Sequence, residues 1–166
     1  IGSLAGGNAN GNMRIESLVT LSQTNNSSPQ SSLPPIVNVP AGAAAHTFNL
    51  NAVDPNMDAL SYALSTTSQS ALSVASPAFY TSVNATTGLV TLNTTVGVSN
   101  GQLYAIQFMI TDARGATTPL DFIMLITSAL PNNPPAFVAP TPANNAIINA
   151  TVGVPMNFTV AASDAD

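Results

Sequence analysis

Apolar and polar residues alternate along much of the chain, and this alternation predicts strands with one buried face. In the clearest run, every second residue is expected to face a core: Tyr104, Ile106, Phe108 and Ile110. The next run alternates in the same way, with expected core residues Phe122, Met124 and Ile126. The short link 113–116 between the runs predicts a β-hairpin. Phe48 and Leu50 are expected to lie opposite this hairpin.

Other strands are predicted where short apolar runs are bounded by Gly, Pro, Asn or Asp. No stretch sustains the i, i+3, i+4, i+7 spacing of apolar residues that an amphipathic helix requires. The chain is therefore predicted to be all-β. The expected strands are 14–22, 46–53, 60–65, 80–83, 89–92, 103–112, 120–128, 146–149 and 156–162.

Two proline-rich segments, 25–35 and 131–135, divide this pattern. Proline fixes φ and lacks a ladder donor, so such segments end sheets and are typical of linkers. The interval 34–131 has the size and strand number of an Ig-like Greek-key β-sandwich. Residues 1–33 are expected to form a linker and the closing strand of a preceding domain. Residues 132–166 are expected to form a linker and the first strands of a following repeat.

An internal repeat supports this division. The segment 48–54 (FNLNAVD) matches 158–164 (FTVAASD), with Phe and Asp six positions apart and an apolar residue two positions after Phe. The offset is 164 − 54 = 110 residues, which is one sandwich with its linker. The chain therefore has the pattern of a repeat protein with one complete sandwich and partial β segments on both sides.

Charge is scarce. Only 5% of the residues are charged, against about 25% in an average soluble domain, and the only cations are Arg14 and Arg114. A net charge of −5 with two arginines excludes binding to nucleic acid phosphates and to anionic membrane surfaces, which need clustered Lys and Arg. A surface with so little charge must be covered by Ser, Thr, Asn and Gln, by sugars, or by copies of the same chain.

Other composition features concern the compartment. The absence of cysteine excludes disulfides and thiolate metal sites. No run of about 18 apolar residues is present, so no membrane insertion is expected. The density of Asn-x-Ser/Thr sequons fits a secreted or cell-surface chain. The candidate glycosylation sites are Asn25, Asn26, Asn84, Asn93, Asn149 and Asn157.

Catalysis is not expected. His46 is the only histidine and Glu16 the only glutamate, and no serine lies in a motif that would activate it as a nucleophile. Neither a paired-carboxylate site nor a phosphate-binding glycine loop is recognisable. The chain is therefore predicted to be neither an enzyme nor a binder of a small-molecule substrate.

Four segments resemble the cadherin-like repeats of bacterial extracellular proteins, in particular the dystroglycan-type cadherin-like subgroup. The segment 54–62 (DPNMDALSY) resembles D-P-D-G-D-x-L-T-Y, and 84–90 (NATTGLV) resembles the T-G-x-I turn. The segment 104–115 resembles Y-x-L-x-V-x-A-x-D-x-x-G, and 133–137 (NPPAF) resembles N-P-P-x-F. The resemblance implies Greek-key β-sandwiches joined end to end, with calcium at the junctions.

The same resemblance implies the residues that would bind calcium, which takes six to eight oxygen ligands. The candidates are Asp54, Asn56, Asp58, Asp112, Asn133, Asp164 and Asp166. The set departs from the family pattern, because segment 27–35 carries no acid, and Ala129 and Asn132 stand where the family has acids. The alternative is that these aspartates cap turns through Asx hydrogen bonds.

Three functions remain open. The first is a structural subunit of an extracellular filament, sheath or surface layer, with copies of itself as partners, assembled head to tail by strand complementation. The second is a stalk or spacer repeat of a large cell-surface adhesin, made rigid by calcium. The third is a carbohydrate-binding accessory module, which the absence of Trp disfavours.

Overall fold

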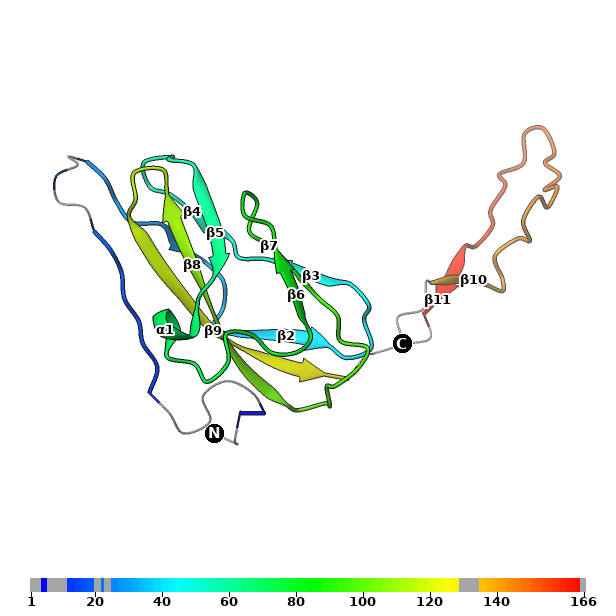
Figure 1. The fold of residues 1–166 in the computed structure, drawn as a ribbon. Coiled ribbons are helices and arrows are strands. Elements are labelled where there is room, and N and C mark those ends of the chain that lie inside the picture. Colours follow the sequence, from blue (N-terminus) through cyan, green and yellow to red (C-terminus); the bar gives the residue numbers. More distant parts are fainter. Residues whose placement is uncertain (1–3, 6–11, 20–21, 23–24, 129–134, 165–166) are drawn as a thin grey trace. The chain divides into compact units, whose positions relative to one another are not determined.

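The computed structural model describes residues 4–5, 12–19, 22, 25–128 and 135–164 (Figure 1). The chain divides into two compact units, Ile1–Ala129 and Leu130–Asp166, here called the first and second units. Each unit is described by itself.

The larger sheet of the first unit has the strand order β2-β9-β8-β5. Strands β8 (Leu103–Asp112) and β9 (Thr117–Thr127) form the predicted hairpin, with Leu103 opposite Leu125 and Thr111 opposite Thr117. Strand β5 (Leu60–Leu64) is antiparallel to β8, and β2 (Ile36–Pro40) is parallel to β9. The hairpin is therefore the centre of the sheet.

The smaller sheet has the order β3-β7-β6, with all neighbours antiparallel. These strands are β3 (His46–Asn49), β7 (Leu89–Leu92) and β6 (Tyr80–Val83). The two orders match the B-E-D and C-F-G sheets of Ig-like sandwiches, with β2 added beside the last strand. Among the remaining elements are a two-stranded ribbon of β1 (Gln30–Ser31) and β4 (Ala52–Val53), and one short helix, α1 (Thr67–Ser70).

The core lies between these two sheets. The ring of Phe48 on β3 meets Phe122 on β9 edge to face at a centroid distance of 5.8 Å. Phe108 stacks on Phe122 at 6.0 Å, and Leu50 is fully buried. The predicted all-β class and the predicted register of the hairpin are both confirmed. The hairpin residues predicted to face the core are all at most 8% exposed: Tyr104, Ile106, Phe108, Ile110, Phe122, Met124 and Ile126.

The turn before β7 is fixed by the side chain of Asn84 and by the conformation of Gly88. The Asn84 side-chain oxygen accepts hydrogen bonds from the N–H groups of Thr86 and Thr87, both at 2.9 Å. Gly88 then adopts a left-handed φ of +68°, and a Cβ atom there would lie 2.8 Å from the ring of buried Tyr62. Only glycine combines this backbone conformation with this close approach.

The strand predictions between residues 36 and 53 need correction. The run 46–53 is not one strand, because Asn51 takes a left-handed φ of 49° and separates β3 from β4. Strand β2 was not predicted, because its five residues (IVNVP) directly follow Pro34 and Pro35 and themselves end in a proline. Its pairing with β9 shows that the proline-rich segment leads directly into the sandwich.

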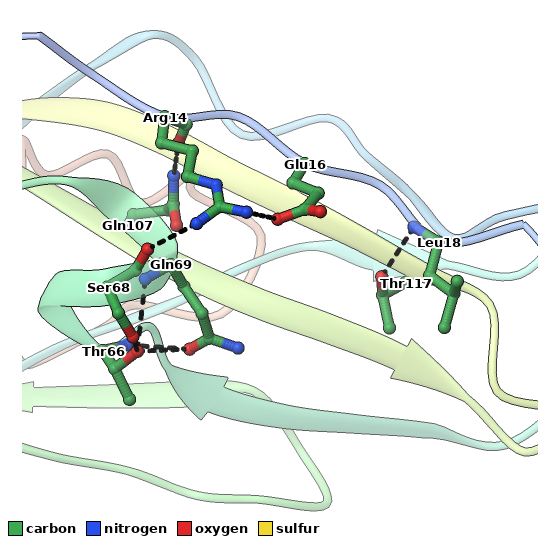
Figure 2. A network of polar contacts seen from close by, with 8 residues as sticks. All are labelled: Arg14, Glu16, Leu18, Thr66, Ser68, Gln69, Gln107 and Thr117. Atoms are coloured by element: carbon green, nitrogen blue, oxygen red, sulfur yellow. Dashed lines mark hydrogen bonds and ion pairs between the residues drawn. The ribbon is translucent and has the colours of Figure 1, made fainter.

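The predicted strand 14–22 is also wrong. In the described part of this segment, the only ladder contact is a single bridge between Leu18 and Thr117. Its residues 14–19 instead lie along the outer side of the larger sheet. The backbone N–H of Arg14 donates to Ser70 O at 2.8 Å. Figure 2 shows that the Arg14 carbonyl accepts from Gln107 Nε2, at 2.8 Å. These contacts leave Gln107 only 1% exposed, although it points away from the core.

Within residues 135–164, the second unit has one pair of antiparallel strands, β10 (Ala136–Val138) and β11 (Ala161–Ser163). The predicted strand 146–149 is absent, and of 156–162 only the last two residues belong to β11. A strand needs a neighbour to satisfy its backbone groups, and two strands cannot provide a sheet for the rest. The apolar residues between them are accordingly exposed.

Candidate metal centre

The strand pairing of the first unit brings two loops together. Leu60 at the start of β5 pairs with Asp112 at the end of β8, so the β4–β5 loop lies beside the β8–β9 turn. The loop carries Asp54 and Asp58, and the turn carries Arg114 in addition to Asp112. Acids that are distant in the sequence therefore meet at one end of the larger sheet.

Asp54 shapes the β4–β5 loop with its own side chain. Its Oδ1 atom accepts hydrogen bonds from the N–H of Asn56 at 2.7 Å and from the N–H of Asp58 at 3.2 Å. Met57, between these two donors, takes a left-handed φ of 64°. This is the Asx type of turn, in which an aspartate replaces a backbone acceptor. Asp54 is only 9% exposed, so the turn also fixes its second oxygen in place.

Asp112 has the most hydrogen bonds of the three acids. Its Oδ1 accepts from the N–H groups of Arg114 at 2.8 Å and Ala116 at 2.9 Å, and its Oδ2 accepts from Asn26 Nδ2 at 2.9 Å. The residue is 4% exposed. Burial by itself would raise the pKa of Asp112, but the bonds from Asn26, Ala116, Arg114 and Gly115 together lower it. Asp112 is thus held as a carboxylate.

The three carboxylates converge. One oxygen from each of Asp54, Asp58 and Asp112 lies within 4.8 Å of the other two. Three buried oxygens of Asp54, Asp58 and the neighbouring Asn26 accept no hydrogen bond: Asp54 Oδ2, Asp58 Oδ2 and Asn26 Oδ1. A buried acceptor without a partner costs about 1–3 kcal/mol. Carboxylate and amide oxygens are the ligands that calcium prefers, so these residues fit a hard divalent cation.

One cation of the chain itself reaches the cluster. Arg114 Nε lies 3.0 Å from Asp58 Oδ2, close enough for an ion pair but not aligned as a hydrogen-bond donor. The Arg114 side chain is 39% exposed and that of Asp58 is 17% exposed. The pair is therefore at the edge of the cluster, partly in contact with water.

The calcium ligands implied by the resemblance are only partly brought together. Asp54, Asp58 and Asp112 meet, and Asn56 lies in the same loop with its Oδ1 accepting from the N–H of Ser27 at 2.7 Å. Asp164 belongs to the second unit, just after β11. Two further candidates lie outside the described residues, namely Asn133 and Asp166.

Sequence reasoning missed two residues of the cluster, Asn26 and Arg114. Asn26 lies at the start of the proline-rich segment 25–35, ahead of the residues 27–35 in which the family pattern would place acids. A signal was present, because the Asn-Asn pair at 25–26 resembles the pair at 132–133 in the second proline-rich segment. Arg114 carried no signal, since its contact with Asp58 depends on the pairing of β5 with β8.

The glycosylation candidates fall into two groups. Asn26 is half-buried, and its Nδ2, the atom to which a glycan would be attached, donates to Asp112. A glycan on Asn26 is therefore incompatible with the observed cluster. The other candidates have exposed side chains: Asn25, Asn84, Asn93, Asn149 and Asn157.

Outside the cluster, burial raises the pKa of three tyrosines, Tyr62, Tyr80 and Tyr104, and also shifts the pKa values of His46 and Asp121. Burial lowers the pKa of His46, whose ring contacts Phe48 at a centroid distance of 6.4 Å. Burial raises the pKa of Asp121, and the hydrogen bond from Gln107 partly offsets this. Both shifts are explained by packing against neighbouring strands.

No helix in the described part of the chain is long and apolar enough to cross a membrane. No family model and no curated protein matches the chain. Among solved structures, the EC1-2 fragment of human protocadherin-24 is similar with 22% identity and a TM-score of 0.49, over 84% of this chain and 61% of that one. The human desmocollin-1 ectodomain is similar with 17% identity and a TM-score of 0.45, over 70% of this chain and 22% of that one. The sandwich assignment follows from the strand pairing given above.

Proposed function

We propose that the chain is a non-enzymatic structural repeat of an extracellular protein, made rigid by a calcium ion in the acidic cluster. The observation that carries this proposal is the convergence of the Asp54, Asp58 and Asp112 carboxylates, together with buried oxygens of Asp54, Asp58 and Asn26 that accept no hydrogen bond. Arg114 pairs with Asp58 Oδ2 only, so Asp54 Oδ2 and Asn26 Oδ1 are left without a partner that a divalent cation would supply.

The proposed ligands come from three separate parts of the first unit. Asp54 and Asp58 belong to the β4–β5 loop, Asp112 to the end of β8, and Asn26 to the segment ahead of β1. A bound ion would supply positive charge and join these parts. The segment that leads into the sandwich would then be held at a fixed angle, which is what a stalk or spacer repeat requires.

Thermal melting tests this proposal. Calcium at about 100 times its Kd stabilises a folded protein by about 2.7 kcal/mol. Adding it to protein that a chelator has first freed of calcium should therefore raise the Tm on the order of 10 °C. The variant Asp54→Asn/Asp58→Asn should show no such rise, because two carboxylates are lost. An unchanged Tm of the wild-type protein on addition of calcium would contradict the proposed calcium site. The aspartates would then have the role of turn caps alone.

A second candidate function, assembly with copies of itself, is supported by the second unit. Phe158 and Val160 are 56% and 58% exposed, and Phe137 is 75% exposed. In the first unit, the repeat-related Phe48 and Leu50 are covered by the β8–β9 hairpin. The second unit thus has an apolar face that lacks the partner strands of its counterpart. The N-terminal segment gives no such support, because it contacts its own sheet.

Sedimentation velocity over a range of protein concentrations tests the assembly proposal. The wild-type chain should associate more as concentration rises, with only weak dependence on salt because there is little charge to screen. The double variant Phe137→Ser/Phe158→Ser should remain monomeric. The control Met57→Ser changes a residue of the first unit that is 92% exposed and should behave like wild type. A wild-type chain that stays monomeric throughout would eliminate this candidate.

A further inference from the structure

We propose that Arg114 is the resident counter-ion of the acidic cluster and competes with a divalent cation for Asp58. Arg114 would thereby set the affinity of the site. This inference rests on the proposed cation site and adds to it a residue that neither the aspartate pattern nor the turn pattern assigns.

The backbone places the Arg114 side chain beside the cluster. The N–H of Arg114 donates to Asp112 Oδ1 at 2.8 Å, and the N–H of Gly115 donates to Asp112 O at 3.2 Å. Gly115 takes a left-handed φ of +90°, which closes the turn. Since Asp112 itself anchors the turn, the guanidinium starts next to one carboxylate and reaches a second, Asp58.

The guanidinium compensates the cluster only in part. Three carboxylates and one guanidinium give a formal charge of −3 + 1 = −2. Arg114 lies against Asp58, whereas Asp54 Oδ2 and Asn26 Oδ1 still accept no hydrogen bond. A guanidinium donates in a fixed planar fork, while a calcium ion can be approached by oxygens from all sides. A calcium ion would therefore be able to bind Asp54 Oδ2 and Asn26 Oδ1, which Arg114 leaves without partners.

Arg114 is also placed so that it can leave. Its side chain is 39% exposed, so it can turn into water without disturbing the core. Asp58 cannot be fully paired with Arg114 and be a strong ligand of a divalent ion at once, because the two cations repel each other at short distance. Binding of the ion must then displace Arg114 from Asp58, and the energy of that ion pair is subtracted from the affinity.

The second arginine provides a matched control. Arg14 also forms an ion pair with an acid, Glu16, and it donates to Ser68 O at 3.1 Å (Figure 2). Arg14→Gln and Arg114→Gln make the same chemical change and the same change in net charge. Only Arg114 contacts an acid of the cluster, so a difference between the two variants reports the local contact rather than the overall charge.

Calcium titration by isothermal calorimetry, with the full chain and both variants, tests the inference. Arg114→Gln should lower the Kd roughly tenfold, whereas Arg14→Gln should leave it within about twofold of wild type. Without calcium, Arg114→Gln should melt at a lower temperature than Arg14→Gln, because the carboxylates lose their compensation. Arg114→Lys, which keeps a positive charge, should have a Kd closer to wild type than to Arg114→Gln. If Arg114→Gln does not fold, Arg114→Lys is the test instead. Its shorter, non-planar ammonium group should compete less strongly with calcium for Asp58, so its Kd for calcium should lie measurably below that of wild type.

The outcomes separate this inference from the proposed function. Wild-type binding with an unchanged Kd in Arg114→Gln overturns the role of Arg114 and leaves the cation site standing. Binding by Arg114→Gln but not by wild type supports the inference, because Arg114 then occupies the site completely. Absence of binding by both proteins overturns the cation site and the inference together.

Discussion

Replacing Phe108 by alanine is expected to lower the free energy of unfolding by roughly 3–5 kcal/mol, which is a large share of the about 5–15 kcal/mol that stabilises a folded domain. Phe108 is fully buried at the centre of the sandwich. Its ring stacks on the ring of Phe122, from the partner strand of the hairpin, at a centroid distance of 6.0 Å. It also contacts the ring of Tyr80, from the smaller sheet, at a centroid distance of 6.0 Å. Alanine would leave a cavity between the two sheets that neither ring can fill without losing its other contacts.

Urea denaturation measures this loss, and Phe137→Ala is the matched control. Phe137 is 75% exposed in the second unit, so the same substitution there should change the unfolding free energy by less than about 0.5 kcal/mol. Similar losses for the two variants would contradict a core centred on Phe108.

Replacing Asp112 by alanine is expected to cost several kcal/mol, because each buried N–H left without an acceptor costs about 1–3 kcal/mol. The variant removes the acceptor of the backbone N–H groups of Arg114 and Ala116 and of Asn26 Nδ2. Asp112→Asn should cost less, because its side-chain oxygen can still accept from both backbone N–H groups. Chemical denaturation in the absence of calcium measures the unfolding free energies of these variants and so ranks their losses. A loss for Asp58→Ala as large as that for Asp112→Ala would show that the hydrogen bonds of Asp112 are not what stabilises the turn.

The contribution of Asp112 to the free energy of unfolding should depend on pH, because the pKa of this residue is lowered in the folded protein. A carboxyl whose pKa is lower in the folded than in the unfolded protein contributes stability that is fully present above its unfolded value, about 3.9. This contribution is lost as the pH falls through the lower, folded value. The difference in unfolding free energy between wild type and Asp112→Asn should therefore be constant near neutral pH and shrink below about pH 4. A difference that grew on acidification would contradict the lowered pKa.

The hairpin was the most predictable part of the fold, because aromatic and aliphatic residues recur at every second position of 104–110 and of 122–126, on both sides of a short turn. Strand β2 lacked such a signal. Its place beside β9 depends on parallel pairing with residues 123–127, about ninety positions away, which no local pattern encodes. The burial of Gln107 on the outer face of β8 could not be predicted for a related reason. It results from contact with Arg14, 93 positions away, and the residues around Gln107 do not indicate it.

The candidate site was predictable where backbone chemistry and the family pattern coincide. Asp54 and Asp112 both cap turns with their own side chains, and a turn-capping aspartate has a local sequence signature. Arg114 has no such signature, and Asn26 has only the resemblance between the Asn-Asn pairs at 25–26 and 132–133, because the roles of both residues arise from contacts across the fold. The bond between Asn26 and Asp112 joins positions 86 residues apart. The second unit was predicted least well, because its strands lack neighbours with which to pair.

The most direct test of the proposed calcium site is an anomalous-scattering map from crystals of the full chain grown with saturating calcium. The account predicts one peak in the first unit with oxygens of Asp54, Asp58 and Asp112 at about 2.3–2.6 Å, and with the Arg114 side chain turned away from Asp58. A map with no peak there, and with Arg114 still paired with Asp58, would contradict it.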